Sequence, residues 1–370
     1  MLTNKALAVF LVVSALAVAA CGREAPSSGS VPLPADPAQP AQPAQPVPGI
    51  SDAELDAAVA SIPRLSSFIL FQNGHIQREF HAHGGARDRP INIKSVSKSI
   101  LNALTGIALE QGHLESLDVP VSRHLPEYFR ELPADDPRRR ITVRHLLSMS
   151  SGLPSTSIGN YGAWVSSRDW VGYALGRALQ SAPGTAMSYS TGDTHILAAV
   201  LTRATGRPLR QFALQHLFAP LGMRVGGWDQ DPQGIYFGGN NLALSPASLL
   251  SFGRLYLDQG RHQHHQVLPA AWVHESWQLR FPNSSFNQRH DYGYLWWHTR
   301  YAGHSTWFAW GYGGQFLFVI PDLDAVVVLT GDPDTRERGA NSLIHAAMEQ
   351  VIVPWARANR ADRIAQAAEA

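Results

Sequence analysis

The sequence of 370 residues contains a single cysteine, Cys21, and only three lysines, Lys5, Lys94 and Lys98. One cysteine excludes an intramolecular disulfide, so the fold must depend on packing alone. Charged residues make up only 16% of the chain, and the formal net charge is +1, with acids and bases scattered throughout. A nucleic-acid partner normally requires a concentrated basic face, so none is indicated. Hydrophobic residues make up 45%, enough for one large core or two closely packed lobes.

The first 20 residues predict an export signal. Lys5 provides the positive start, residues 6–18 form an apolar run, and small residues precede Cys21. The run is too short to favour a membrane-spanning helix, which needs about 20 residues. Val-Ala-Ala-Cys at 18–21 is similar to the bacterial lipobox. This resemblance implies lipidation at Cys21, with membrane contact through the lipid anchor only, on the periplasmic side of a bacterial membrane. Ordinary secretion with cleavage nearby is the alternative.

Residues 21–50, after the signal, are expected to form a lipidated tether. They are rich in Pro, Ala and Gln and contain three Ala-Gln-Pro units. Such a segment cannot bury much apolar surface and stays extended. We expect the folded domain at 51–358, followed by a polar tail at 359–370.

Strands are predicted mainly at the two ends of this domain, where they form a sheet, and helices mainly in its middle, where they form an insert. Capping residues, apolar periodicity and prolines near helix starts predict helices at 51–61, 95–111, from 142, and at 168–179, 193–204, 208–218, 246–256, 269–277 and 336–355. Strand patterns occur at 67–72, 75–80, 292–299, 306–310, 315–320 and 325–330. An Asn-Gly pair at 73–74 is a strong hairpin signal. The order predicts an α+β fold: an antiparallel sheet made from both chain ends and flanked by helices, with an all-helical insert at about 115–285.

The scarcity of lysine draws attention to Ser95, because both lysines outside the signal flank it. The other basic residues are arginines, which cannot give up a proton in a protein. For Lys94, chance placement is the simpler explanation. Ser95 and Lys98 are three residues apart at a predicted helix start, so both side chains can share one face. Burial and the helix dipole would lower the pKa of Lys98 and let it accept the Ser95 proton.

With this pair as its first motif, the chain resembles the superfamily of serine β-lactamases and penicillin-binding proteins over about residues 55–355. The similarity is greatest to the class C β-lactamase-like branch, which includes esterases and nylon-oligomer hydrolases. It is carried by Ser-Val-Ser-Lys at 95–98, Ile-Thr-Val-Arg-His-Leu-Leu at 141–147, Ser-Gly-Leu-Pro at 151–154, Tyr-Ser-Thr-Gly at 189–192, Pro-Leu-Gly-Met at 220–223 and Gly-Tyr-Gly-Gly-Gln at 311–315. The resemblance implies a β-lactamase/transpeptidase-like fold.

The resemblance also implies roles for individual residues. Ser95 would be the acylated nucleophile and Lys98 its partner. Tyr189 would help to deprotonate Ser95 and later activate water, if the charge of Lys98 lowers its pKa. A core tyrosine with a satisfied hydroxyl is the structural alternative for Tyr189.

The third motif of the family, Lys-Thr-Gly, matches Tyr312, Gly313 and Gly314 here, with a register uncertain by one residue. Glycines allow substrate to lie against the backbone. The N–H of Gln315 would then form an oxyanion hole with that of Ser95. A glycine-rich turn between strands is the alternative.

Two departures from the family pattern affect the substrate. Tyr312 replaces the cationic lysine that anchors a carboxylate, and Thr191 replaces an asparagine that can orient the acyl side chain. The sequence therefore predicts a serine hydrolase that cleaves a small ester, amide or peptide-like substrate through an acyl-enzyme, with no metal or organic cofactor. A β-lactamase or D-amino-acid peptidase is one alternative, and a non-catalytic cell-wall binder with the same fold is another.

Overall fold

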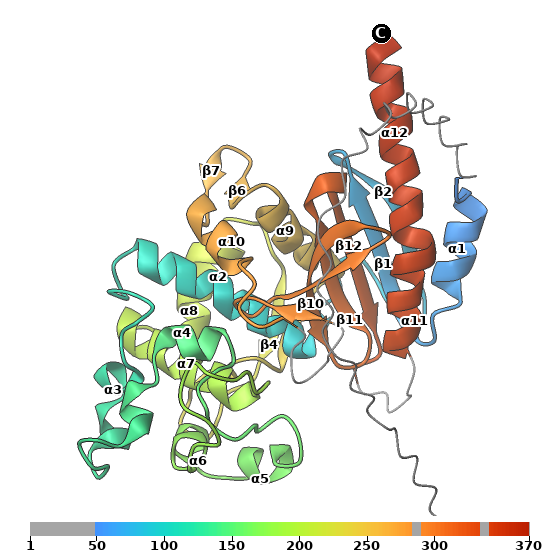
Figure 1. The fold of residues 1–370 in the computed structure, drawn as a ribbon. Helices are drawn as coiled ribbons and strands as arrows, with labels where there is room; N and C mark the ends of the chain where they lie inside the picture. Colours follow the sequence, from blue (N-terminus) through green and yellow to red (C-terminus); the bar gives the residue numbers. More distant parts are fainter. Residues whose placement is uncertain (1–48, 283–289, 334–339, 370) are drawn as a thin grey trace, which may run out of the picture. The chain divides into compact units, whose positions relative to one another are not determined.

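The computed structural model describes residues 49–282, 290–333 and 340–369, and its centre is a seven-stranded antiparallel sheet (Figure 1). The strand order is β2-β1-β12-β11-β10-β9-β8. The bounds are β1 (Leu65–Gln72), β2 (His75–His81), β8 (Asp291–Tyr292), β9 (Trp297–Tyr301), β10 (His304–Gly311), β11 (Gln315–Ile320) and β12 (Ala325–Gly331). The first two strands come from the beginning of the domain and pair with each other, and β1 also pairs with the last strand, β12. The prediction of a sheet made from both chain ends is confirmed.

The hairpin between β1 and β2 forms where the sequence predicts it. Asn73 and Gly74 have φ angles of 52° and 82°, and Gln72 pairs directly with His75. Two consecutive left-handed residues give the turn a twist that matches the flanking strands. The hairpin therefore puts β2 at one edge of the sheet, beside β1.

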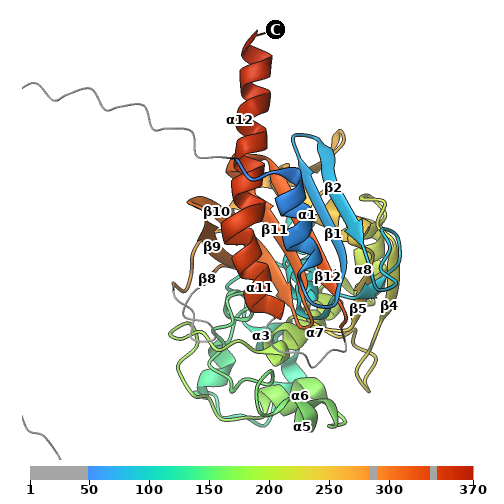
Figure 2. The same ribbon diagram turned by 90° about the vertical axis from the view of Figure 1, so that its right-hand side faces the viewer.

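Helices cover both faces of this sheet, which is why β12 is buried along its whole length. Helices α1 (Asp52–Ala60), α11 (Ala340–Ala347) and α12 (Val353–Glu369) lie over one face, as Figure 2 shows. Helix α9 (Pro246–Leu257) packs on the other face, against β11 and β12. The expected capping box opens α1, and α12 continues through the residues expected as a polar tail. The expected start of the last helix, 336–339, lies outside the described residues.

The region expected as an insert, 115–285, is mainly helical. Besides α9 it contains α3 (Val121–His124), α4 (Val143–Leu147), α5 (Tyr161–Val165), α6 (Trp170–Leu175), α7 (Thr191–Thr205), α8 (Leu209–Ala213) and α10 (Ala270–Ser276), and α2 (Ser97–Glu110) precedes it. The expectation that it is all-helical is wrong, because β4 (Val225–Trp228) and β5 (Leu242–Leu244) form a small sheet with β3 (Ile91–Asn92), and β6 (Arg261–His262) pairs with β7 (His265–Gln266). None of the helices in the described segments is long and apolar enough to cross a bilayer.

The predicted strand at 292–299 is wrong as a single element. Only its ends pair, in β8 and β9, because the backbone between them bonds to helices instead of to a strand. Asn102 and Ser99 of α2 donate side-chain hydrogen bonds to the carbonyls of Tyr294 and Leu295, at 2.8 and 2.7 Å. Leu295 adopts a left-handed backbone with φ of 57°. This turn fastens α2 to the sheet.

Helix α2 lies inside the molecule, and its residues 97–108 are all buried. A helix buried on every side is surrounded by protein instead of lying on a surface. It packs against α7 and β10, and Lys98 in its first turn contacts Thr191 at the beginning of α7. Segments that are far apart in the sequence therefore meet beside Ser95, which lies in the turn directly before α2.

Candidate active site

Ser95 lies in a 3₁₀ turn, Lys94–Val96, directly before α2, and not in the α-helix that the sequence predicts from residue 95. Lys94 has a left-handed backbone with φ of 51°. Its N–H donates to Asn92 Oδ1 at 2.9 Å, and its carbonyl accepts from Ser97 Oγ at 2.7 Å. A non-glycine residue with a left-handed backbone is strained, and this conformation persists only where neighbouring residues hold it. The held turn fixes the position of Ser95 in the cleft.

Lys98 contacts Ser95 as the spacing predicts. Its Nζ lies 3.0 Å from Ser95 Oγ, 3.1 Å from Thr191 Oγ1 and 2.7 Å from the Gly239 carbonyl. The side chain is only 2% exposed. Burial lowers the pKa of Lys98 from 10.5 to about 7. A substantial fraction of the amine is therefore neutral near pH 7 and able to accept a proton.

The partners of Lys98 determine where its lone pair points. The Gly239 carbonyl can only accept, so it takes one N–H of the amine. When Thr191 Oγ1 takes the second N–H, the lone pair of a neutral amine faces Ser95 Oγ. The arrangement can deprotonate the hydroxyl without any movement of the lysine.

Tyr189 belongs to the loop before α7, and its side chain lies beside Ser95 and Lys98. Its ring stacks on Trp297, with centroids 5.6 Å apart, and lies 5.1 Å from Lys98 Nζ. Burial raises the pKa of Tyr189, and the hydrogen bond with Ser95 opposes this only in part. The expectation that Lys98 lowers the pKa of Tyr189 is therefore wrong. With its pKa raised above the usual value by burial, Tyr189 is a phenol at neutral pH.

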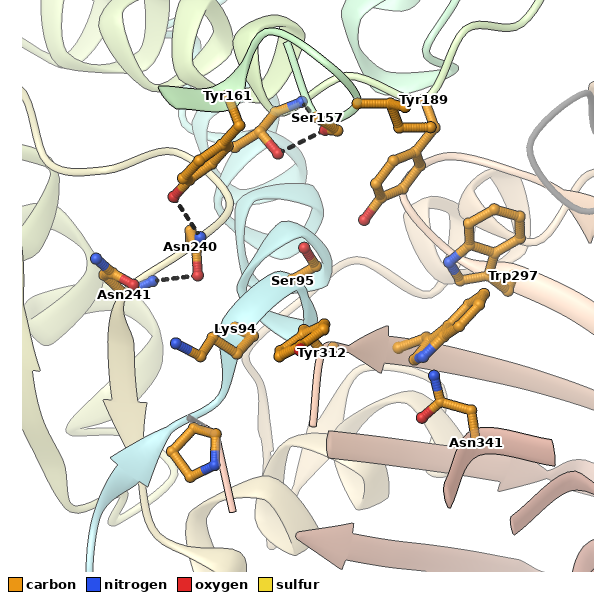
Figure 3. A pocket seen from close by; sticks show the side chains of 15 residues that line it. Lys94, Ser95, Ser157, Tyr161, Tyr189, Asn240, Asn241, Trp297, Tyr312 and Asn341 are labelled. Atoms are coloured by element: carbon orange, nitrogen blue, oxygen red, sulfur yellow. Dashed lines mark hydrogen bonds between the residues drawn. The ribbon is translucent and has the colours of Figure 1, made fainter. Parts of the chain in front are cut away.

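These side chains open into a cleft of about 730 Å³. Ser95 lies between a polar end and an aromatic end (Figure 3). The polar end contains Lys94, Tyr161, Asn240 and Asn241. The aromatic end contains Trp297 and Trp310, whose ring centroids are 5.8 Å apart, with Asn341 on the same side, and Tyr312 lies between the two ends. Within the described residues, the lining has no Asp or Glu. The cleft can hold a substrate of moderate size with its two sides in different environments.

The third motif occupies the cleft in a different register from the expected one. Gln315 is fully buried, begins β11 opposite Gly311, and hydrogen-bonds the Gly331 carbonyl through its side chain at 2.9 Å. It does not line the cleft, and neither do Gly313 and Gly314, which form the turn between the strands with φ of 79° and 81°. The assignment of Gln315 to the oxyanion hole is therefore not supported.

Gly311 and Tyr312 line the cleft beside Ser95 instead. A Cβ on Gly311 would collide with the Ile93 carbonyl and stand 3.2 Å from Lys94 Cβ. The end of β10 thus lies directly against the turn that carries Ser95, and only glycine fits there. Tyr312 projects into the cleft and is 57% exposed.

Thr191 belongs to the site, as the motif implies. Its hydroxyl contacts Lys98, and it has no side-chain amide to offer a substrate. Its backbone N–H donates to Ser157 Oγ at 2.8 Å, and its hydroxyl lies 2.8 Å from the same oxygen. Sequence reasoning missed Ser157, Gly239 and Asn240. Asn240 Nδ2 donates to Tyr161 at 2.8 Å at the polar end of the cleft. The Gly-Gly pair at 238–239 was the one local signal available.

The chain is similar to known proteins in sequence and in fold. The family model for Beta-lactamase matches residues 78–349. A 6-aminohexanoate-dimer hydrolase of Paenarthrobacter ureafaciens is 25% identical over 325 residues, which cover 76% of this chain and 79% of that protein. Esterase EstB of Burkholderia gladioli is 32% identical over 155 residues, which cover 38% of this chain and 39% of the esterase. The solved structure of EstCE1, a hydrolase with promiscuous acyltransferase activity, superposes with a TM-score of 0.65 at 20% identity and covers 80% of this chain and 97% of that one.

The fold and these similarities together define a serine hydrolase. The chain belongs to the β-lactamase family, because the family model spans well over half of its length.

Proposed function

We propose that the protein hydrolyses an ester or amide through an acyl-enzyme formed on Ser95. The observation that carries the proposal is the contact of 3.0 Å between Ser95 Oγ and Lys98 Nζ, together with the lowered pKa of that amine. Lys98 takes the hydroxyl proton while Ser95 Oγ attacks the carbonyl carbon. The bond to the leaving group then breaks and leaves the acyl group on Ser95.

Tyr189 would relay the proton to the leaving group. A hydroxyl both donates and accepts, so Tyr189 can pass the proton from the Lys98 ammonium to the departing oxygen or nitrogen. Its raised pKa suits this role, because a phenolate is never needed as a resting state. Water then attacks the acyl-enzyme, and its proton returns along the same groups.

The negative oxygen of the intermediate would accept from two backbone N–H groups, those of Ser95 and Tyr312. Tyr312 follows Gly311, whose backbone lies against the turn that carries the nucleophile. Two fixed donors that point at the developing oxyanion stabilise its charge without having to reorient during the reaction.

The substrate would be a small ester or amide, as in the esterase and nylon-oligomer-hydrolase part of the class C-like branch. The names of the two similar proteins, a 6-aminohexanoate-dimer hydrolase and an esterase, fit the cleavage of an amide or an ester bond. The match of Tyr312 to the lysine of the family belonged to the register that the structure does not support, so it carries no argument about a substrate carboxylate. The aromatic end of the cleft suits an apolar group.

We propose further that the protein is a lipoprotein, anchored at Cys21 on the periplasmic side of a bacterial membrane. Cys21 and the signal before it lie outside the described residues, so the lipobox-like sequence is the support. Metabolic labelling with a fatty acid tests the anchor. Label on the wild type that is lost in Cys21→Ser supports it, and an unlabelled, secreted wild type contradicts it.

A fluorophosphonate probe tests the enzymatic proposal. We expect labelling of the wild-type protein, turnover of p-nitrophenyl esters, and weak or no hydrolysis of nitrocefin. Ser95→Ala should abolish both labelling and turnover. A wild-type protein that neither labels nor turns over any ester, amide or β-lactam would instead be a non-catalytic binder.

A further inference from the structure

A buried histidine–aspartate pair contacts the loop whose Gly239 carbonyl accepts from Lys98. His195 of α7 has its Nε2 at 2.9 Å from Asp231 Oδ2, and both side chains are fully buried. The ring packs among Trp164, Trp170 and Phe237, with centroids 5.2–5.9 Å away. Neither member of the pair touches the cleft. The mechanism above does not use them.

The hydrogen bonds of this pair assign the protons of the imidazole. Asp231 Oδ1 also accepts the N–H groups of Gln233 and Ile235, at 2.9 and 2.8 Å. Burial raises the pKa of Asp231, but the His195 and backbone hydrogen bonds outweigh it and hold the pKa below its usual value. The carboxylate is therefore ionised and acts only as an acceptor. His195 must carry a hydrogen on Nε2 to donate to it.

The other ring nitrogen faces the backbone of the loop that contacts Lys98. The Gly238 N–H donates to His195 Nδ1 at 3.2 Å, so Nδ1 must be unprotonated. Thr194 Oγ1 donates to the Gly238 carbonyl at 2.7 Å. These two bonds hold both polar groups of Gly238 on α7. The next carbonyl along the chain, that of Gly239, is the one that accepts from Lys98 Nζ at 2.7 Å.

The loop can lie this close to α7 and Lys98 only because Gly238 and Gly239 have no side chains. A Cβ on Gly238 would collide with the Thr194 carbonyl. Gly239 has φ of 103°, and a Cβ there would stand 2.8 Å from Lys98 Cγ. Two glycines thus let the backbone pass between α7 and the lysine.

We infer that Asp231 and His195 are positioning residues for the reaction: they fix one tautomer of the imidazole, which holds the Gly238–Gly239 loop so that its carbonyl aims the Lys98 lone pair at Ser95. This inference rests on the acyl-enzyme function proposed above. A displaced carbonyl would let Lys98 rotate, and a misplacement of about 1 Å can cost a reaction about 100-fold. The carbonyl also stabilises the ammonium that forms when Ser95 is deprotonated.

Asp231→Asn is the most informative variant, because asparagine has the same shape as aspartate but replaces one acceptor oxygen with a donating N–H₂ group. The amide nitrogen would donate to Nε2 and drive the imidazole hydrogen onto Nδ1, where it meets the Gly238 N–H. We expect kcat for ester hydrolysis to fall about 10- to 100-fold with KM nearly unchanged. We also expect the pH midpoint of the acid limb to move by about half a unit or more. Thr194→Val removes the second anchor of the same loop and should show the same pattern.

Leu201→Ala provides the matched control, because Leu201 is fully buried on the same helix and is not among the cleft-lining residues. It should lower stability while kcat and the pH midpoint stay at the wild-type values. If Asp231→Asn and Thr194→Val behave like this control, the pair is purely structural and the inference is wrong.

A measurement on the wild-type protein covers the case in which the variants fail to fold. Imidazole ¹⁵N spectra should show a neutral His195 with its hydrogen on Nε2 at pH 7.5, and a hydrogen on Nδ1 overturns the inference. Failure of the proposed function would look different, because the wild-type protein itself would form no acyl-enzyme.

Discussion

Replacing Lys98 with methionine should make the folded protein more stable at neutral pH while abolishing its activity. Burial lowers the pKa of Lys98 from 10.5 to about 7. An unfolded chain keeps the lysine protonated up to its ordinary pKa, so the folded state binds fewer protons between pH 7 and 10.5. The free energy of unfolding therefore rises with pH through this window, and the full cost of burying the amine is present below it.

The structure sets the size of the effect. The pKa difference corresponds to about 5 kcal/mol, at about 1.4 kcal/mol per unit. Methionine removes this cost but also loses the hydrogen bonds to Gly239 and Thr191, which contribute about 1–1.5 kcal/mol each. We expect Lys98→Met to be about 2 kcal/mol more stable than the wild type at pH 7, and about 2 kcal/mol less stable at pH 10.5, where only the lost hydrogen bonds remain.

Urea denaturation of both proteins across this pH range provides the assay. Lys98→Arg is the matched control: arginine keeps its charge at every pH and should be destabilising throughout. The reasoning is refuted if Lys98→Met differs from the wild type by the same amount at pH 7 and pH 10.5, because the lysine would then not be held neutral by the fold.

Three further variants test other parts of the account. Tyr189→Phe removes the proton relay and should lower kcat by about 100-fold or more with little change in KM, as steady-state kinetics would show; an unchanged kcat would mean a packing role only. Gly239→Ala should lower both kcat and thermal stability, because its Cβ would crowd Lys98 in a left-handed backbone, and wild-type values in both would contradict the described loop. Burial raises the pKa of Asp193 from 3.8 to about 7, so the stability of the wild type should fall as pH rises through this window. Asp193→Asn should therefore be more stable than the wild type at pH 8, by up to about 4 kcal/mol, and nearly equal at pH 4 in chemical denaturation; an equal difference at both pH values would show that Asp193 is not held protonated.

The features predicted correctly from the sequence are those with local causes. The Asn73-Gly74 turn and the Ser51 capping box depend on neighbouring residues, and both form as expected. The contact between Ser95 and Lys98 follows from their spacing of three on one turn. Patterns of a few residues carry enough information for such structures.

The features that the sequence did not predict depend on tertiary contacts. The aromatic run at 292–299 has a strand-like composition, but side chains of α2 take its carbonyl groups and bend it. The register of the third motif is set by how the glycine turn after Gly311 folds, so Gln315 was placed in the cleft while it is buried in the sheet. Ser157 and Asn240 come from loops far from Ser95 in the chain, where no local pattern marks them.

The pH dependence of fluorophosphonate labelling, followed by intact mass and peptide mapping, tests whether Lys98 activates Ser95. We expect one adduct, on Ser95, whose rate of formation rises with pH through a single midpoint of about 7, the pKa of Lys98. An adduct on another residue, or a labelling rate that does not change between pH 5 and about 9, would contradict it.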